Sequence, residues 1–157
     1  ANMPIDELVG IARSFVENHG VEILFIDYIQ ILQASQSMQR KDKREQILDT
    51  SMRLKQLARD LNVPVVVAAQ LVRDADRERP RLGSFSESSQ IEKDADVAIL
   101  IWHTQKEREV EVNGKKGKVK EDRSYLLVAK NRDGQTSDVP VYFKKETQTF
   151  ENLDDWN

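Results

Sequence analysis

The stretch Val21 to Gln33, V-E-I-L-F-I-D-Y-I-Q-I-L-Q, decides the fold of this chain. Its apolar run from Ile23 to Ile26 stops at a carboxylate, Asp27. A short, β-rich run between a glycine and a polar segment is typical of a strand buried on both faces, as in a parallel sheet covered by helices. Ligands of open α/β sheets bind at the carboxyl ends of strands, so Asp27 is a candidate metal ligand or base. An aspartate that caps the following turn fits this position equally well.

A second strand of the same kind is predicted from Val63 to Ala69, and it ends at a polar residue, Gln70. Between the two strands, an apolar stripe from about Lys43 to Asn62 predicts a single helix. Two strands joined by one helix form a right-handed crossover whose strand ends lie side by side. We therefore expect Asp27 and Gln70 to face one ligand.

The other predicted elements continue the α/β alternation. Pro4 and Gly20 bracket an amphipathic helix. Residues 73–89 are predicted to form a long surface loop, and the charged segment 104–122 a protruding hairpin or a disordered insertion. Strands are predicted at Val97–Trp102, Tyr125–Ala129, Val139–Phe143 and Thr149–Glu151, and residues 153–157 are predicted to be a frayed end.

Composition narrows the class of protein. The 157 residues, 39% of them hydrophobic, are enough for one domain with one core, and no apolar run is long enough to span a membrane. The chain has no cysteine, which excludes disulfides and thiolate chemistry and agrees with a cytosolic location. Its two histidines lie far apart in the sequence, which argues against a zinc site. The absence of methionine at position 1 suggests a chain cut from something longer.

The formal charge of −3 means that any nucleic-acid binding must come from local clusters of cations. One cluster, in the polar segment after Gln33, includes Arg40 and Lys41. Another is Lys130 and Arg132, at the predicted tip of the hairpin that contains Asp133-Gly134. From the residues alone, both clusters read as ordinary solvated surface.

Four motifs carry a resemblance to a known family. F-I-D-Y-I-Q-I-L, V-P-V-V-V-A-A-Q-L-V-R, S-Q-I-E-K-D-A-D-V-A-I-L-I and A-K-N-R-D-G-Q-T, in this order and spacing, resemble the C-terminal ATPase domain of DnaB-type replicative helicases. The resemblance runs from about Pro4 to Asn152. It implies an α/β fold with a RecA-like P-loop NTPase core, a mostly parallel sheet flanked by helices and a C-terminal β-hairpin. Residues 1–152 would then be the C-terminal portion of that domain, with 104–122 as a charged hairpin insertion.

The resemblance also implies a function. It implies a homohexamer that hydrolyses ATP between subunits, moves along single-stranded DNA and unwinds the duplex during replication. Asp27 matches the Walker B aspartate, which holds Mg²⁺, usually through water, and Gln70 matches the residue that senses the γ-phosphate. Lys130 and Arg132 match the basic pair that reaches the neighbouring subunit's nucleotide, with Arg132 as the arginine finger. Such an arginine contributes on the order of 10³ to 10⁵ in rate in comparable NTPases.

The segments 33–44 and 82–91 match the family's two DNA-facing loops. In the second loop the family typically has R-E-S-G, whereas this chain has S-E-S-S at 86–89, so a phosphate-contacting arginine and a glycine are absent. Backbone amides still allow phosphate contact, and Arg81 or Arg40 is a candidate to compensate. The DNA-binding candidates are therefore Arg40, Lys41, Arg81, Ser86, Glu87 and Ser89. A helicase loader and primase are implied as further partners.

The chain lacks the phosphate-binding loop, because G-x-x-x-x-G-K-[ST] occurs nowhere in it. The family places that loop, its strand and the water-activating glutamate before the equivalent of Ala1. We therefore expect the isolated chain to have no ATPase activity. The missing strand would lie between the strand that ends at Gln70 and the one at 96–102, which leaves two open edges. Those strands close on each other, or another chain fills the gap, or the domain is marginally stable; the last two are favoured.

Two other functions fit parts of the sequence. One is a non-hydrolysing RecA-like interaction module that docks on a helicase ring, a loader or DNA. The other is a different RecA-like ATPase, of the recombinase or signalling type. The K-x-R-x-G hairpin together with I-E-x-D-A-D favours the helicases over that second alternative. A P-loop encoded directly upstream would favour the helicase over the module, and a start codon there would favour the module.

Overall fold

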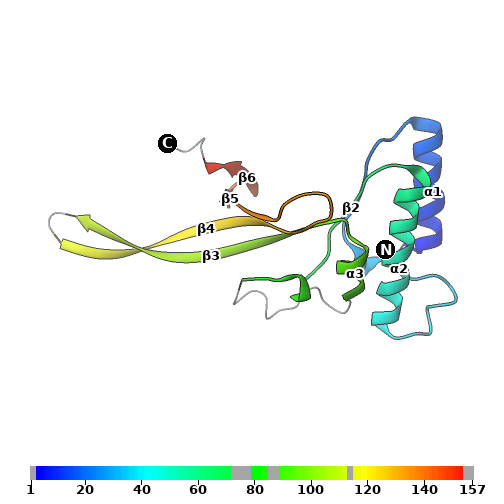
Figure 1. Cartoon of the computed structure of the whole chain (residues 1–157), viewed down its shortest axis with the longest axis horizontal. Helices are drawn as coiled ribbons and strands as arrows, with labels where there is room; N and C mark the ends of the chain where they lie inside the picture. The colour runs from blue at the N-terminus through cyan, green and yellow to red at the C-terminus, as the bar shows by residue number, and fades with distance from the viewer. Residues whose placement is uncertain (1–2, 72–78, 85–88, 113–114, 154–157) are drawn as a thin grey trace. The chain divides into compact units, whose positions relative to one another are not determined.

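The computed structural model describes residues 3–71, 79–84, 89–112 and 115–153 (Figure 1). The chain divides into two compact units, 1–72 with 83–95, and 73–82 with 96–157. The first contains α1 (Ile5–His19), β1 (Leu24–Ile26), the 3₁₀ turn η1 (Ile29–Ile31), α2 (Lys43–Leu61), β2 (Val65–Val67) and α3 (Ser89–Asp94). The second contains β3 (Val97–Val112), β4 (Lys115–Asn131), β5 (Ser137–Lys144) and β6 (Thr149–Asn152). A second 3₁₀ turn, η3, covers Leu82–Ser84.

Both long helices begin and end where the sequence predicts. Helix α1 follows Pro4 and ends at Gly20, whose φ of 65° is left-handed and whose N–H donates to the Val16 carbonyl oxygen at 3.2 Å. Helix α2 follows Asp42, whose carboxylate accepts the Glu45 N–H at 2.8 Å, and it ends at the left-handed Asn62. These residues satisfy main-chain groups that a helix end leaves open, so they fix the helix boundaries.

Strands β1 and β2 pair in parallel, with Leu24 opposite Val65 and Ile26 opposite Val67. This confirms the predicted parallel pair joined by α2. The core of the first unit lies beside it and is formed by Ile5, Ile29, Leu32 and Leu54, with Ile26 and Val67 among the side chains packed against it. The strands therefore place their carboxyl ends at one edge, next to the core that α1, η1 and α2 share.

The prediction that the first three strands are buried on both faces is wrong for this chain. Phe25 in β1 is 73% exposed and Val66 in β2 is 46% exposed. In β3, Val97, Ile99 and Ile101 are each about half exposed. An apolar residue at every strand position tells which faces are able to pack, whereas burial requires a second layer of structure, which the described residues do not supply on these faces.

The second unit is an antiparallel sheet in the order β3-β4-β5-β6. Strands β3 and β4 pair from Val97 opposite Asn131 to Val112 opposite Lys115. The predicted strand at 97–102 is thus the base of a longer one, and 104–122 is the distal part of one hairpin, as in the first of the two predicted alternatives. The closing strand predicted near the end of the chain is β6, which pairs with β5.

Aromatic side chains line both faces of this second sheet. On one face the Trp102 and Tyr125 rings stack with centroids 5.5 Å apart, and the Arg79 guanidinium lies 5.9 Å from the Trp102 centroid. On the other face His103 Nδ1 is 2.7 Å from the Ser124 hydroxyl, and its ring lies 5.2 Å from that of Phe143. His103 is therefore a packed strand residue, as expected from its position.

The two sheets do not pair with each other. Among the described strands, β2 pairs only with β1 and β3 pairs only with β4. Of the three predicted outcomes for the open edges, closure of these strands on each other is thus not the one observed. No helix within residues 3–71, 79–84, 89–112 and 115–153 is long and apolar enough to cross a membrane.

Candidate functional site

The ends of β1 and β2 bring Asp27 and Gln70 to one edge of the parallel pair. Asp27 directly follows β1, and the register Ile26 opposite Val67 continues past the strands. The Ala68 N–H donates to the Ile26 carbonyl oxygen at 2.9 Å, and the Ile29 N–H donates to the Ala68 carbonyl oxygen at 3.0 Å. The two segments therefore lie side by side, as the parallel arrangement predicts.

Gln30 fastens these two segments together. Its Nε2 donates to the Gln70 carbonyl oxygen at 3.2 Å, and its Oε1 accepts the Gln70 N–H at 3.2 Å. The side-chain amide thus occupies both main-chain groups of Gln70, as a neighbouring strand would. The exposed side chains of Asp27 and Gln70 form no hydrogen bond or ion pair in the described part of the chain. Both are available to a ligand.

Asp27 is a lone carboxylate at this edge. Nowhere among the described residues do three or more histidine, aspartate or glutamate side chains gather as a metal site. Mg²⁺ is commonly held by one or two carboxylates together with water and substrate phosphates. A single exposed carboxylate fits that mode of binding, and it does not fit a metal site formed by protein ligands alone.

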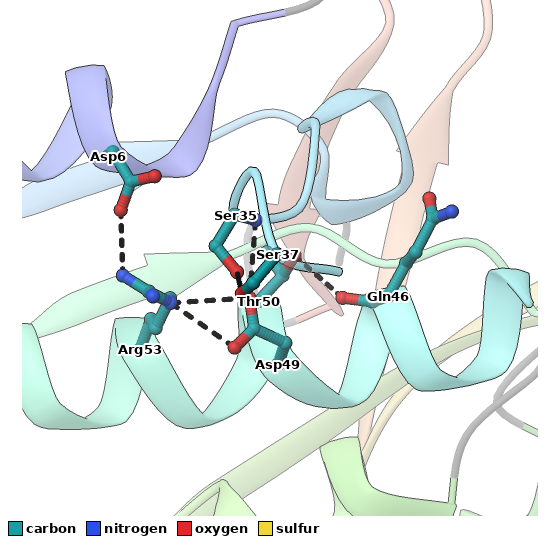
Figure 2. A network of polar contacts seen from close by, with 7 residues as sticks. All are labelled: Asp6, Ser35, Ser37, Gln46, Asp49, Thr50 and Arg53. Carbon is teal, nitrogen blue, oxygen red and sulfur yellow. Dashed lines mark hydrogen bonds and ion pairs between the residues drawn. The ribbon is translucent and has the colours of Figure 1, made fainter. Parts of the chain in front are cut away.

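The segment after η1 is anchored to α2 at its start (Figure 2). The buried Ser35 donates its N–H to Asp49 Oδ2 at 3.3 Å. Arg53 Nε donates to the other oxygen of Asp49 at 3.2 Å, and its Nη1 donates to Asp6 Oδ1 at 2.8 Å. Asp49 therefore joins the start of this loop, helix α2 and, through Arg53, helix α1.

The far end of the same loop is also held by α2. Gln46 Nε2 donates to the carbonyl oxygens of Gln39 and Lys41, at 3.2 and 2.8 Å. The cations of the loop stay exposed: Arg40 has no partner among the described residues, and Lys41 Nζ lies 3.9 Å from Glu45. The loop thus has a fixed main chain and two accessible positive charges.

A chain of hydrogen bonds connects this loop to the strand edge. Lys43, the first residue of α2, donates from Nζ to the Gln30 carbonyl oxygen at 3.2 Å. Gln30 in turn holds Gln70. Sequence reasoning missed Gln30, Lys43 and Asp49, since their partners lie 13 to 40 residues away. The one available signal was Gln30 itself, a polar residue between Ile29 and Ile31.

The second unit holds Arg132 beside Asp96. The Arg132 N–H donates to the Asp96 carbonyl oxygen at 2.9 Å, and Nη1 donates to Asp96 Oδ1 at 2.8 Å. The Arg132 side chain is 53% exposed. Lys130 does not lie in the turn as predicted. It is still part of β4, opposite Ala98, because β4 continues to pair with β3 beyond the last β5 partner at Val128.

Comparison with known proteins assigns this arrangement to a family. The model of the DnaB-like helicase C terminal domain matches residues 1–152. The chain belongs to this family. Its fold is that of the family's RecA-like ATPase domain, because it superposes on a solved helicase-type ATPase domain with a TM-score of 0.76 at 28% identity, over 98% of this chain and 52% of that one.

Curated relatives of the DnaB-like family carry the same name. A probable plasmid replicative DNA helicase of Chlamydia psittaci is 35% identical over 93% of this chain and 30% of its own length. The replicative DNA helicase DnaC of Bacillus subtilis is 31% identical over 96% of this chain and 32% of its own length. A solved DnaB-like replicative helicase, described with its interactions with primase, has a TM-score of 0.73 at 28% identity, over 98% of this chain and 36% of that one. The chain thus spans about a third of the curated relatives it matches.

The second predicted DNA-facing loop of the DnaB-like fold is only partly described. Ser86 and Glu87 lie outside the described residues, and Ser89 is the first residue of α3. Arg81 is exposed, directly before η3. The departure from the family's R-E-S-G pattern, and compensation by Arg81 or Arg40, therefore stay predictions.

Proposed function

We propose that this chain is the C-terminal part of the ATPase motor of a hexameric replicative DNA helicase. In that protein, ATP hydrolysis between subunits drives movement along single-stranded DNA and unwinding of the duplex. The observation that carries the proposal is the pair of unpartnered side chains, Asp27 and Gln70, on described segments that Gln30 fastens together at one strand edge. Two polar groups at the carboxyl ends of neighbouring parallel strands support a shared ligand.

In this proposal Asp27 and Gln70 act on the same nucleotide. Asp27 holds Mg²⁺ through water, and a bound Mg²⁺ neutralises charge on the β- and γ-phosphates of ATP. Gln70 contacts the γ-phosphate through its side-chain amide. The hydrogen bonds from Gln30 to the Gln70 main chain keep that amide at the strand edge whether or not nucleotide is present.

Arg132 and Lys130 are proposed to act on the nucleotide of the neighbouring subunit. An arginine supplied across a subunit interface spreads its charge over the transferring phosphoryl group. The exposed guanidinium of Arg132 supports this role, because a side chain buried in its own subunit could not reach a neighbour. Asp96 would orient the guanidinium until the nucleotide arrives.

The anchored loop around Arg40 and Lys41 is proposed to bind single-stranded DNA. Cations on a fixed main chain hold phosphates without reading sequence, as a translocating motor requires. Arg81 and the segment with Ser86, Glu87 and Ser89 would form the second contact. Since relatives are about three times longer, we propose that the P-loop and the activating glutamate lie outside this chain, and that primase and a helicase loader are partners of the cytoplasmic whole.

The nucleotide roles are tested by placing this chain in a complete motor. The chain replaces the matching segment of the Bacillus subtilis relative, and ATP turnover with single-stranded DNA is measured. We expect Asp27→Asn to abolish turnover and Arg132→Ala to lower it by at least about 10³-fold. The control Arg13→Ala removes an exposed arginine on α1 and should leave turnover unchanged.

Mixing subunits tests whether Arg132 acts across an interface. Rings assembled from Asp27→Asn and Arg132→Ala subunits contain interfaces with an intact Asp27 on one side and an intact Arg132 on the other. We therefore expect mixed rings to regain part of the turnover that each variant alone lacks. Full turnover by the Arg132→Ala ring alone would contradict the proposed role.

The DNA-binding role is tested on the chain itself by fluorescence anisotropy with labelled single-stranded DNA. Each ion pair with a phosphate that a substitution removes should reduce the slope of log K against log salt by about 0.7. We expect Arg40→Ala and Lys41→Ala to act in this way and Arg13→Ala to leave the slope unchanged. Equal affinities and slopes for all of these variants would remove the loop from the DNA-binding site.

A further inference from the structure

The distal part of the β3–β4 hairpin has two open edges. Strand β4 pairs with β5 only from Ser124 to Val128, so among the described strands residues 104–112 and 115–123 form a ribbon of two strands (Figure 1). A two-stranded ribbon is marginally stable in water, and an open edge is a template for another strand. The ribbon therefore needs either protection or a partner.

The register places unlike charges in two rows on one face of this ribbon. Alternate residues of a strand share a face. Directly opposite each other stand Glu107 and Lys120, Glu109 and Lys118, and Glu111 and Lys116. We call the three glutamates of β3 the acidic row and the three lysines of β4 the basic row. One edge of the ribbon is thus acidic on this face and the other edge is basic.

We propose that this ribbon binds the ribbon of a second copy of the chain, edge to edge. When two copies have the same orientation, β4 of one runs antiparallel to β3 of the next, as a continuous antiparallel sheet requires. The basic row of the first copy then lies beside the acidic row of the second. Two marginal ribbons become one four-stranded sheet in which the inner rows of the two copies carry opposite charges.

The charge pattern selects this head-to-tail contact over a symmetric one. Pairing β3 with β3, or β4 with β4, would set like charges directly beside each other, which is destabilising. The opposite face carries one such pair in the reverse order, Lys106 with Glu121, so the three pairs of the rows set the preference. A head-to-tail contact uses two different surfaces and leaves one of each free, so it extends to a ring or a filament. The contact depends on residues outside the nucleotide and DNA sites, and it is independent of the function proposed above.

Charged edges in proteins usually prevent aggregation, so this alternative has to be distinguished. A protective edge works by repulsion, which requires the same charge on both edges. Here the two edges attract each other, since one carries glutamates and the other lysines. Protection alone predicts a monomer, whereas edge pairing predicts a concentration-dependent assembly.

The test is a complete exchange of the two rows. The row-exchanged variant carries E107K, E109K, E111K, K116E, K118E and K120E. Each cross-strand pair keeps opposite charges, so the ribbon keeps its own stabilisation. By sedimentation velocity with a fluorescent tracer, we expect the wild-type chain and the row-exchanged variant each to self-associate. Wild-type tracer should bind the row-exchanged variant at least about tenfold more weakly than it binds wild type, because every contact at that edge sets like charges together.

Two further measurements complete the experiment. Chains with only the three glutamate changes, or only the three lysine changes, should be monomeric alone and should associate when mixed. The control R13E/D60K exchanges an exposed ion pair between α1 and α2 and should bind wild-type tracer as wild type does. The proposal is overturned if the wild-type chain stays monomeric up to its solubility limit. It is also overturned if wild type binds the row-exchanged variant as tightly as it binds itself.

Discussion

Asp122 and Lys145 shift each other's pKa at the base of the ribbon. The hydrogen bond from Lys145, supported by one from Gln105, lowers the pKa of Asp122 below its usual 3.8. The same hydrogen bond to Asp122 raises the pKa of Lys145 above its usual 10.5. Both side chains are exposed, so the pair is a local titration effect and not a major source of stability.

The pH dependence of this pair has a definite sign. A lowered Asp122 pKa makes its contribution complete above 3.8 and lost as the pH falls through the lowered value. A raised Lys145 pKa makes its contribution complete below 10.5 and lost as the pH rises through the raised value. In an NMR titration, Lys145→Ala should move the Asp122 midpoint back toward its usual value. Lys144→Ala should leave it in place, and a wild-type midpoint at the usual value would contradict the hydrogen bond.

Asp42 is expected to stabilise α2 through its cap. Its carboxylate accepts the Glu45 N–H, so Asp42→Ala leaves that donor without its partner. We expect the free energy of unfolding to fall by about 1 kcal/mol, measured by urea denaturation. Asp42→Asn, whose side-chain oxygen caps equally well, should lose only a fraction of that. If both variants lose the same amount, the carboxylate acts through something other than the cap.

At the scale of elements, Asp49 joins α1, α2 and the loop between η1 and α2. Asp49→Ala removes the acceptor of the buried Ser35 N–H and of Arg53 (Figure 2). An unsatisfied buried donor costs about 1 to 3 kcal/mol, so we expect a loss of that size in urea denaturation. Asp60→Ala, on the same helix but exposed, should cost less than about 0.5 kcal/mol. Equal losses would mean that the network adds nothing beyond surface charge.

The link between Gln30 and Gln70 is expected to appear in amide exchange. Gln30→Ala removes the acceptor of the Gln70 N–H, so exchange of that amide should speed up by about tenfold, as for loss of one ordinary hydrogen bond. Gln30→Glu keeps an acceptor for the Gln70 N–H and should retain most of the protection. Unchanged exchange in Gln30→Ala, followed by NMR, would show that the strand edge holds without this side chain.

How far the sequence predicts an element depends on where its determinants lie. The ends of α1 and α2 could be predicted because Gly20, Asp42 and Asn62 act within one turn of the helix. The meeting of Asp27 and Gln70 could be predicted because parallel strands share an edge. The partners of Gln30 and Asp49 could not, since hydrogen bonds between distant segments leave no periodic pattern. The exposure of Phe25 escaped prediction for a similar reason, because burial depends on what covers a residue.

For the molecule as a whole, the sequence identified the family more surely than the surface. Four motifs in order pointed to the DnaB-like helicases, and the match over residues 1–152 confirms that assignment. The uncovered faces around Phe25 and Val66 became apparent only in three dimensions. The counter-ion of Arg132 also escaped, because Asp96 lies 36 residues away in the sequence.

The isolated chain is expected to be inactive as an ATPase. It has Asp27 and Gln70 but no G-x-x-x-x-G-K-[ST] sequence, so it lacks the backbone cradle that holds the phosphates in P-loop enzymes. A phosphate-release assay with ATP, Mg²⁺ and single-stranded DNA should give no turnover above the buffer rate. The row-exchanged variant serves as a control of equal composition. Turnover that single-stranded DNA stimulates, and that Asp27→Asn removes, would contradict this expectation.

The contact between Arg132 and Asp96 implies that the arginine is stored in an aimed position and is easily released. An exposed ion pair of this kind contributes at most about 1 kcal/mol, so a more highly charged anion can take the guanidinium at little expense. The bond from the Arg132 N–H to the Asp96 carbonyl oxygen survives such an exchange, because it involves only the main chain. The head of the side chain is thus free to switch partners while its root keeps its place.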